Sequence, residues 1–242
     1  MYSWSKADGK RSAQMPNMDF FKRFWKKYST KQPRYAQLDY SRYFELSAIG
    51  GMRLERRYLG KLALPKGYLL VCDPLLGLHD ALPYTRRVPP GQYPVSLLVA
   101  TGSLSKKNAM LRMSFSEERP QRWELALLPG QEASPDHADD AYYGFTADAG
   151  IGCLCDAQVQ QYFNLYLERF FKDHPDGNVY STLFAAAFEK NGGLGANFYL
   201  PSSPQMNAML FHTGYGDGIY PAYWGLGKNG NICSFVIDFL VL

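Results

Sequence analysis

Residues 59–72 read LGKLALPKGYLLVC, two short apolar runs on either side of the turn Pro65-Lys66-Gly67. Similar runs follow, separated by proline and glycine turns such as Asp73-Pro74 and Pro89-Pro90-Gly91. Short strands at nearly regular spacing with such turns between them are typical of an antiparallel sandwich or a barrel-like sheet. The sequence therefore predicts a β-rich body with strands over 59–64, 68–72, 93–100, 109–114, 123–128 and 142–147.

Two later segments interrupt this strand pattern. Aromatic and aliphatic residues recur at helical spacing over 156–172, where Asp156 is expected to cap the helix. A second helix is predicted over 181–190, capped by Ser181 and ended by Gly192-Gly193. Residues 194–205 are expected to form a loop, and the last strands are expected over 209–213 and 231–242.

Charge separates the N-terminal segment from the rest of the chain. Residues 1–34 contain nine lysines and arginines and two aspartates, so their net charge is +7, whereas the whole chain carries +4 and the remainder therefore −3. Residues 18–28, MDFFKRFWKKY, predict a short amphipathic helix. The expected organisation is a basic arm with this helix over 1–53 and a single β-rich domain over 54–242. The fold class is therefore α+β, an antiparallel sandwich-like body with an N-terminal amphipathic helix and one or two inserted helices.

The four cysteines, Cys72, Cys153, Cys155 and Cys233, lie among apolar or glycine neighbours. No export signal precedes them, so buried reduced thiols and a cytoplasmic location are expected. Cys153 and Cys155 form a C-x-C pair rather than the C-x-x-C of zinc and redox sites, and in a strand they share one face as small core residues. We expect no cofactor, and no run of about 18 apolar residues predicts a membrane-spanning helix.

The most distinctive stretch is 213–227, TGYGDGIYPAYWGLG, which combines five glycines with one aspartate and four aromatic rings. A glycine-rich turn of this kind can present rings and a carboxylate to a partner. We expect it to lie at one end of the β body, as a rigid, non-catalytic turn beside residues 148–152. The candidate partner-binding residues are Tyr215, Asp217, Tyr220, Tyr223 and Trp224.

Acidic residues in two of these stretches leave a second interpretation open. Asp148, Asp156 and Asp217 could together hold a hard cation, with His212 as a base. Each acid also has a local structural role available, as a turn former or a helix cap. No G-x-S-x-G or H-E-x-x-H motif is present to support a hydrolase.

Six phrases in order resemble one bacterial family, the domain of unknown function 4241. They are LPKGYLLVCDPL (64–75), VPPGQYPVSLLVA (88–100), RWELAL (122–127), DAGIGCLCD (148–156), GYGDGIYPAYWG (214–225) and VIDFLVL (236–242). The resemblance covers about 59–242 and implies a soluble bacterial protein with no established reaction. The family pattern carries an arginine-led R-x-A phrase where this chain has Lys107-Asn108-Ala109. Any role of that arginine therefore does not carry over.

Three functions are consistent with these observations. The first is a non-catalytic protein-binding module, including an immunity-type neutraliser of a bacterial toxin, because aromatic residues are abundant and no catalytic set is recognisable. The second is a metal-assisted hydrolase that uses the three aspartates and His212. The third is an adaptor for a membrane surface or for nucleic acid through residues 1–34. Nucleic acid is the less expected partner, because the body outside this arm carries a slight negative charge.

Overall fold

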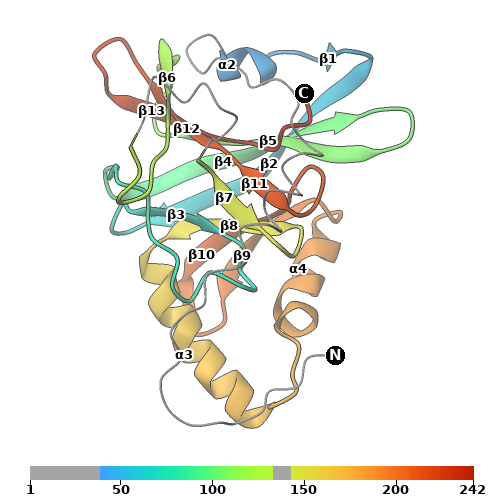
Figure 1. The fold of residues 1–242 in the computed structure, drawn as a ribbon, viewed down its shortest axis with the longest axis vertical. Helices are drawn as coiled ribbons and strands as arrows, with labels where there is room; N and C mark the ends of the chain where they lie inside the picture. Colours follow the sequence, from blue (N-terminus) through green and yellow to red (C-terminus); the bar gives the residue numbers. More distant parts are fainter. Residues whose placement is uncertain (1–38, 133–142) are drawn as a thin grey trace. The chain divides into compact units, whose positions relative to one another are not determined.

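Antiparallel strands dominate the structure, a computed structural model that describes residues 39–132 and 143–242 (Figure 1). The larger sheet has seven strands in the order β1-β2-β4-β5-β13-β12-β6, all paired antiparallel. The expected β-rich antiparallel body is therefore confirmed. The strands are β1 (Ala48–Ile49), β2 (Met52–Leu64), β4 (Gly91–Thr101), β5 (Lys106–Ser114), β6 (Arg122–Leu125), β12 (Ala222–Leu226) and β13 (Ile232–Asp238).

A second sheet packs against the first and completes the sandwich. Its order is β3-β8-β10-β9, again antiparallel, and a separate pair joins β11 to β7. Side chains from both sheets, including Leu97, Leu154, Phe211 and Trp224, form one core in which each of these four is fully buried. The strands are β3 (Leu69–Cys72), β7 (Phe145–Ala147), β8 (Ile151–Asp156), β9 (Gly195–Leu200), β10 (Ser203–His212) and β11 (Gly218–Tyr220).

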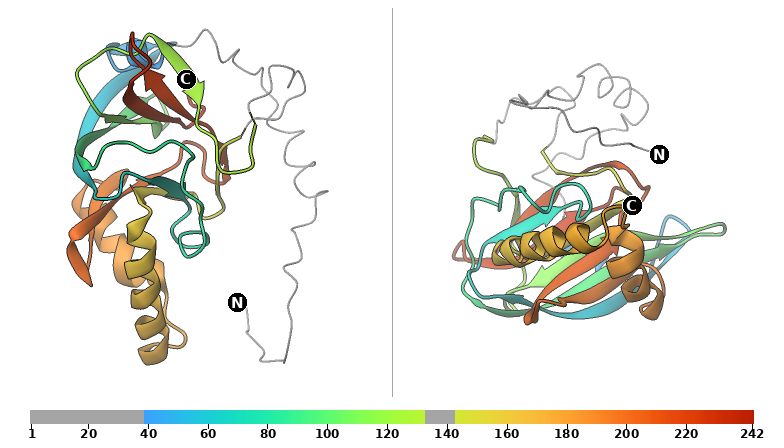
Figure 2. Two further views of the ribbon diagram at one scale, coloured as in Figure 1. Left: turned by 90° about the vertical axis from the view of Figure 1, so that its left-hand side faces the viewer. Right: turned by 90° about the horizontal axis from the view of Figure 1, so that it is seen from below.

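Helices cover the faces of the sheets that point away from this core. The helix α3 (Gln158–Asp173) and the short α4 (Ala185–Lys190) lie on the four-stranded sheet. In Figure 1 α3 lies at the lower left and α4 at the right, and in the view from below (Figure 2, right) the helices lie in front of the strands. The short helix α2 (Tyr40–Tyr43) covers part of the outer face of the seven-stranded sheet. Among the helices of the described residues, none combines the length and the apolar character needed to cross a membrane.

Strand β8 shows why the sequence lacks the usual alternation of apolar and polar residues here. All six residues of IGCLCD are buried, because the sandwich covers one face and the helices cover the other. Leu154 points to the sandwich core, whereas Cys153 and Cys155 point to the helical side. All four cysteines are free and buried, as expected, and Cys72 Sγ lies 3.6 Å from Cys153 Sγ.

The start of the second inserted helix differs from the prediction. Ser181 does not cap it: the side chain of Asn178 accepts the Ser181 backbone N–H at 3.0 Å, and a π-helical turn over Tyr180–Phe184 precedes α4. The expected end is confirmed, because Gly192 and Gly193 both have positive φ. Asp156 does serve the start of α3, where its Oδ1 accepts the Gln158 N–H at 2.9 Å.

The prediction of a loop over 194–205 is wrong, because this segment contains β9 and the first residues of β10. The loop is predicted because glycine is frequent in turns, but Gly195 lies within β9. A Cβ on Gly195 would lie 2.7 Å from Leu97 Cδ1 and 3.0 Å from the Leu210 carbonyl oxygen. The glycine therefore marks a close approach of β9 to the sandwich core rather than a turn.

Residues before the expected domain start at 54 also belong to the described body. Tyr40 and Phe44 are each 1% exposed, and β1 pairs with β2. These residues cover Met110 and Val236 on the outer face of the seven-stranded sheet. The amphipathic helix expected over 18–28 and most of the basic arm lie outside the described residues.

Candidate functional site

The glycine-rich turn at 213–218 connects β10 to β11. Hydrogen bonds to backbone carbonyls, within the turn and in the adjoining turn, hold it in place. The Thr213 hydroxyl donates to the Gly150 carbonyl at 3.1 Å and to the Gly216 carbonyl at 2.5 Å as alternative acceptors, and the Tyr220 hydroxyl donates to Gly216 at 2.8 Å. The Thr213 backbone N–H also reaches the Gly150 carbonyl, at 3.1 Å. The turn is therefore fixed by neighbouring side chains and by the adjoining turn at 148–150.

These two turns lie side by side, as the sequence predicts. A Cβ on Gly150 would come within 3.4 Å of the Gly216 Cα, so the backbones nearly touch. Gly150 and Gly216 both have positive φ, +65° and +91°, which explains why glycine stands at both positions. Gly218 is not in the left-handed region; a Cβ there would instead meet the ring of Tyr220 at 3.3 Å.

A buried carboxylate, Asp73, holds the turn at 148–150 by accepting hydrogen bonds from its backbone. Asp73 is only 3% exposed, and its Oδ2 accepts the backbone N–H groups of Asp148 and Ala149 at 3.0 and 2.7 Å. Its Oδ1 accepts the Leu75 N–H at 2.9 Å. One side chain at the end of β3 thus positions two loops, and the sequence reading assigned it only to a turn.

Tyr215 is the exposed ring of this site. It is 61% exposed, whereas Tyr220, Tyr223 and Trp224 are 3%, 1% and 0% exposed. The Lys107 ammonium lies 4.7 Å from the centroid of the Tyr215 ring and donates to the Gly214 carbonyl at 3.2 Å. A cation over an aromatic face is attractive, so Lys107 restrains a ring that otherwise faces solvent.

The three buried rings have a structural position instead. Trp224 and Tyr220 are part of the sandwich core, and Tyr223 stacks on Tyr40 under α2 with ring centroids 4.7 Å apart. In this structure these rings are not accessible to a partner. Of the five candidate partner-binding residues, only Tyr215 and Asp217 are exposed.

Asp148 and Asp217 meet at the exposed surface of the two turns. The pKa of Asp148 is raised, first by partial burial and then by the negative charges of Asp73 and Asp217. Asp217 Oδ1 would lie 3.9 Å from a Cβ placed on Gly150, so the two exposed carboxylates and Tyr215 lie on adjoining turns. We call Asp148, Tyr215 and Asp217 the acidic turn.

The other residues of the hydrolase interpretation do not complete a metal site with Asp148 and Asp217 in the described residues. Asp156 ends β8, whose six residues extend over about 17 Å from Ile151, and Asp148 lies beyond the other end of the strand. Asp156 is fully buried, and its Oδ2 accepts the backbone N–H groups of Lys66 and Gly67, both at 2.9 Å. Its carboxylate is therefore used by the turn between β2 and β3, and the three-acid site is not assembled.

His212 lies next to the turn at 148–150, because it pairs with Ile151 and a hydrogen bond with the Gly150 backbone favours its charged form. Its ring centroid lies 4.5 Å from that of Phe188 in α4, and burial lowers its pKa. Within residues 39–132 and 143–242, no group of three or more histidine, cysteine or acidic side chains has the geometry to hold a metal ion. Within these residues, Asp148, Asp156, Asp217 and His212 therefore do not form one metal site.

Sequence reasoning found the acidic turn but missed the residues that hold it, namely Asp73, Lys107 and Thr213. Each lies far from the turn in sequence or beside it without a distinctive motif. The one available signal was Asp73 itself, an acid at the end of an apolar strand, because a buried carboxylate needs hydrogen-bond donors.

Comparison with known protein families finds one family that matches most of the chain. The family described as "Protein of unknown function (DUF4241)" matches residues 62–237. The chain belongs to the DUF4241 family. The matched region runs from β2 to β13 and includes both turns of the site. No curated protein and no solved structure gives a significant match.

Proposed function

We propose that this DUF4241 chain is a non-catalytic protein-binding module of the bacterial cytoplasm, of the immunity type that neutralises a toxin. The observation that carries the proposal is the exposed Tyr215 ring, restrained by Lys107 on a turn fixed at both ends. Exposed tyrosines are frequent among the residues that dominate binding energy. A turn that is already rigid loses little conformational entropy on binding, which favours affinity.

Charge supports a partner with a basic contact surface. Asp217 follows the ring by two residues and Asp148 lies on the adjoining turn, and each would gain from a lysine or arginine of the partner. Reduced buried cysteines fit a reducing compartment. Two observations support the immunity type. The chain belongs to the DUF4241 family, and the described residues combine this surface with no assembled catalytic set.

Site-specific photo-crosslinking tests the proposal. A photoreactive phenylalanine analogue replaces Tyr215 in cells of the source bacterium, and the matched control carries it at Tyr199, another exposed tyrosine at 54%, on β9. We expect a discrete protein adduct at position 215 and none at 199. Adducts that are equal at both positions, or absent at 215, would contradict the acidic turn as a contact surface.

A further inference from the structure

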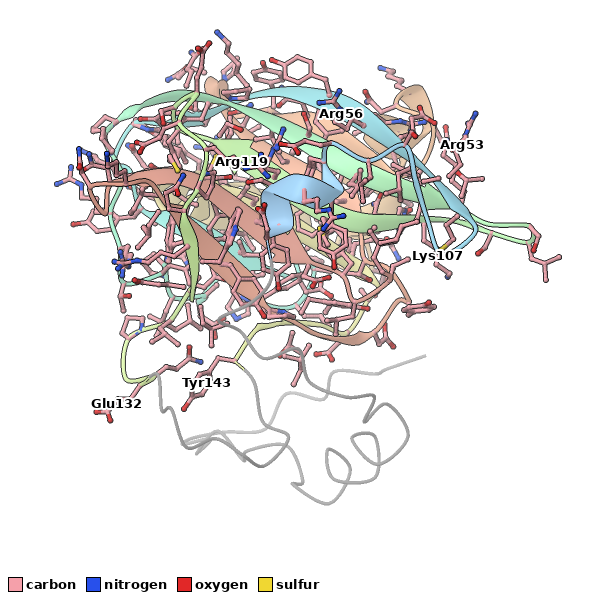
Figure 3. All side chains as sticks on the ribbon, turned by 90° about the horizontal axis from the view of Figure 1, so that it is seen from above. Arg53, Arg56, Lys107, Arg119, Glu132 and Tyr143 are labelled. Atoms are coloured by element: carbon pink, nitrogen blue, oxygen red, sulfur yellow. The ribbon has the colours of Figure 1, made fainter. Side chains whose placement is uncertain are left out.

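A second surface lies on the outer face of the seven-stranded sheet, beside the part that α2 covers. Tyr58 in β2 pairs with Ser96 in β4, and Ser96 pairs with Arg112 in β5. Directly paired residues project from the same face, so these three form a row across three strands. Arg56, two residues before Tyr58, extends the same face of β2 (Figure 3). We call Arg56, Tyr58, Ser96 and Arg112 the basic row.

The Arg112 guanidinium is held in place by an aromatic ring. Its Cζ lies 4.3 Å from the centroid of the Phe44 ring, which is itself buried. The pKa of Arg112 is lowered, first by burial and then by the positive charge of Arg56. Two guanidinium groups thus lie close enough to repel each other, and one of them is restrained.

No acid in the described part of the chain pairs with either guanidinium. Glu55 pairs with Arg53 and Lys106, and Asp39 and Glu45 pair with Arg119. The other ion pairs of the described residues likewise include neither Arg56 nor Arg112. Glu45 attracts Arg112 from a distance, but its carboxylate contacts Arg119 at 3.3 Å. The hydrogen bonds of the described residues likewise include none from the Arg56 or Arg112 side chains. Within the described part of the chain, both guanidinium groups of the basic row therefore lack an acidic partner, which an external anion would supply.

From this geometry we infer that the basic row docks an acidic segment of a protein partner. Arginine and tyrosine are the side chains most enriched where partners bind, and carboxylates match the guanidinium fork. Tyr58 is 61% exposed, and the small Ser96 between it and Arg112 leaves room for an incoming side chain. The inference rests on the proposed function, to which it adds a second contact of opposite charge.

A nucleic acid fits this surface less well than an acidic peptide. Lys61, which pairs with Pro94, adds a third cation to the same face. Nucleic-acid-binding surfaces often neutralise about 6–10 phosphates, many more than three cations can contact. Two cavities of the described residues lie along α3 and beneath it, and no residue of the basic row lines either of them.

Nuclear magnetic resonance with a defined probe tests the inference. A peptide of ten glutamates is added to the full chain at constant ionic strength, and the arginine Nε–Hε signals are followed. We expect the signals of Arg56 and Arg112 to shift. Arg56→Gln, an exposed change that leaves the Phe44 contact intact, should weaken binding at least about fivefold.

The matched control is Arg53→Gln, which removes the same charge from the same strand. Arg53 lies three residues from Arg56 and is partnered by Glu55 at 3.7 Å. Peptide binding should stay within about twofold of wild type in this variant. An equal loss in both variants, no shift at Arg112, or tighter binding of a ten-nucleotide DNA than of the peptide would overturn the inference. Because the probe does not involve Tyr215, failure here leaves the crosslinking result at the acidic turn unaffected.

Discussion

Gly216 shows how one backbone angle sets the geometry of the acidic turn. Its φ of +91° is a conformation that side chains with a Cβ rarely adopt, although no atom lies within 4 Å of a Cβ placed there. The cost of a substitution is therefore backbone strain and not steric overlap. Its carbonyl also accepts bonds from Thr213 and Tyr220, so a changed φ would misdirect both.

We predict that Gly216→Val destabilises the protein by about 1–3 kcal/mol, measured by urea unfolding. Gly216→Asn is the matched control, because asparagine tolerates positive φ better than other residues with a side chain. It should cost clearly less than valine. Equal losses for the two variants would show that backbone conformation is not the cause.

Asp238 is the second residue whose chemistry the structure defines. It is 7% exposed at the end of β13, a charged residue in an otherwise apolar strand. Its Oδ1 accepts the Leu240 N–H at 2.8 Å, and the nearby Tyr40 hydroxyl also favours the charged form. Burial outweighs both and raises its pKa from 3.8 to about 6. No lysine or arginine is among the groups that act on it.

Because the folded pKa is above the unfolded one, the folded protein binds this proton more tightly. The stability associated with Asp238 is therefore fully present below pH 4 and is lost as the pH rises through 6. Asp238→Asn keeps the acceptor oxygen and removes the charge. We predict that its free energy of unfolding, relative to wild type, increases by about 2 kcal/mol when the pH is raised from 4.5 to 7.5. Urea unfolding at both pH values checks this. A difference between variant and wild type that is independent of pH would contradict the raised pKa.

At the scale of elements, Asp73 connects β3 to the turn before β8. It accepts three backbone N–H groups from two loops, and a carboxylate can accept all of them with its two oxygens. An asparagine amide would direct its own N–H groups toward at least one of these donors. The two loops are therefore sensitive to a change of a single atom.

We predict that Asp73→Asn lowers the free energy of unfolding by about 1.5–3 kcal/mol. It should also speed hydrogen exchange at the Asp148 and Ala149 amides. Asp80→Asn, at an exposed acid in the following loop, is the control and should change little. Unchanged exchange at both amides in Asp73→Asn would exclude Asp73 as the anchor of this turn.

The elements also show which parts of the fold sequence could predict. Strands with clear turn signals, such as β3 and β4, and the amphipathic α3 follow from local patterns. Strand β9 could not be predicted, since Gly195 is required by contacts with Leu97 and Leu210, which are distant in the sequence. The cap at Asn178 could not be predicted for a different reason, because several nearby residues could serve that role equally well.

At the scale of the whole described body, two small surfaces of opposite charge stand out from a well-packed sandwich. The acidic turn could be found from sequence because glycine, aspartate and tyrosine cluster within a few residues. The basic row could not, because its members come from three strands and meet only through the sheet register. Burial likewise decides that Tyr223 and Trp224 pack inside while Tyr215 does not, and no local pattern distinguishes them.

We predict that Asp217→Asn leaves the fold intact and keeps partner binding within about tenfold, or roughly 1.4 kcal/mol, because the change is nearly isosteric at an exposed position. Thermal melting and calorimetry with the crosslinked partner would measure both effects. Elemental analysis provides the control for chemistry. A stoichiometric divalent metal in the wild type that is lost in Asp217→Asn would favour the hydrolase interpretation instead.

The central claim is that the restrained Tyr215 ring is a partner contact. The most direct test is the affinity of the partner recovered at position 215 for Tyr215→Ala and for the matched variant Tyr199→Ala, measured by titration calorimetry. The account predicts a loss of at least about tenfold, near 1.4 kcal/mol, for Tyr215→Ala and an unchanged affinity for Tyr199→Ala. Wild-type affinity in Tyr215→Ala, with its melting temperature unchanged, would contradict it.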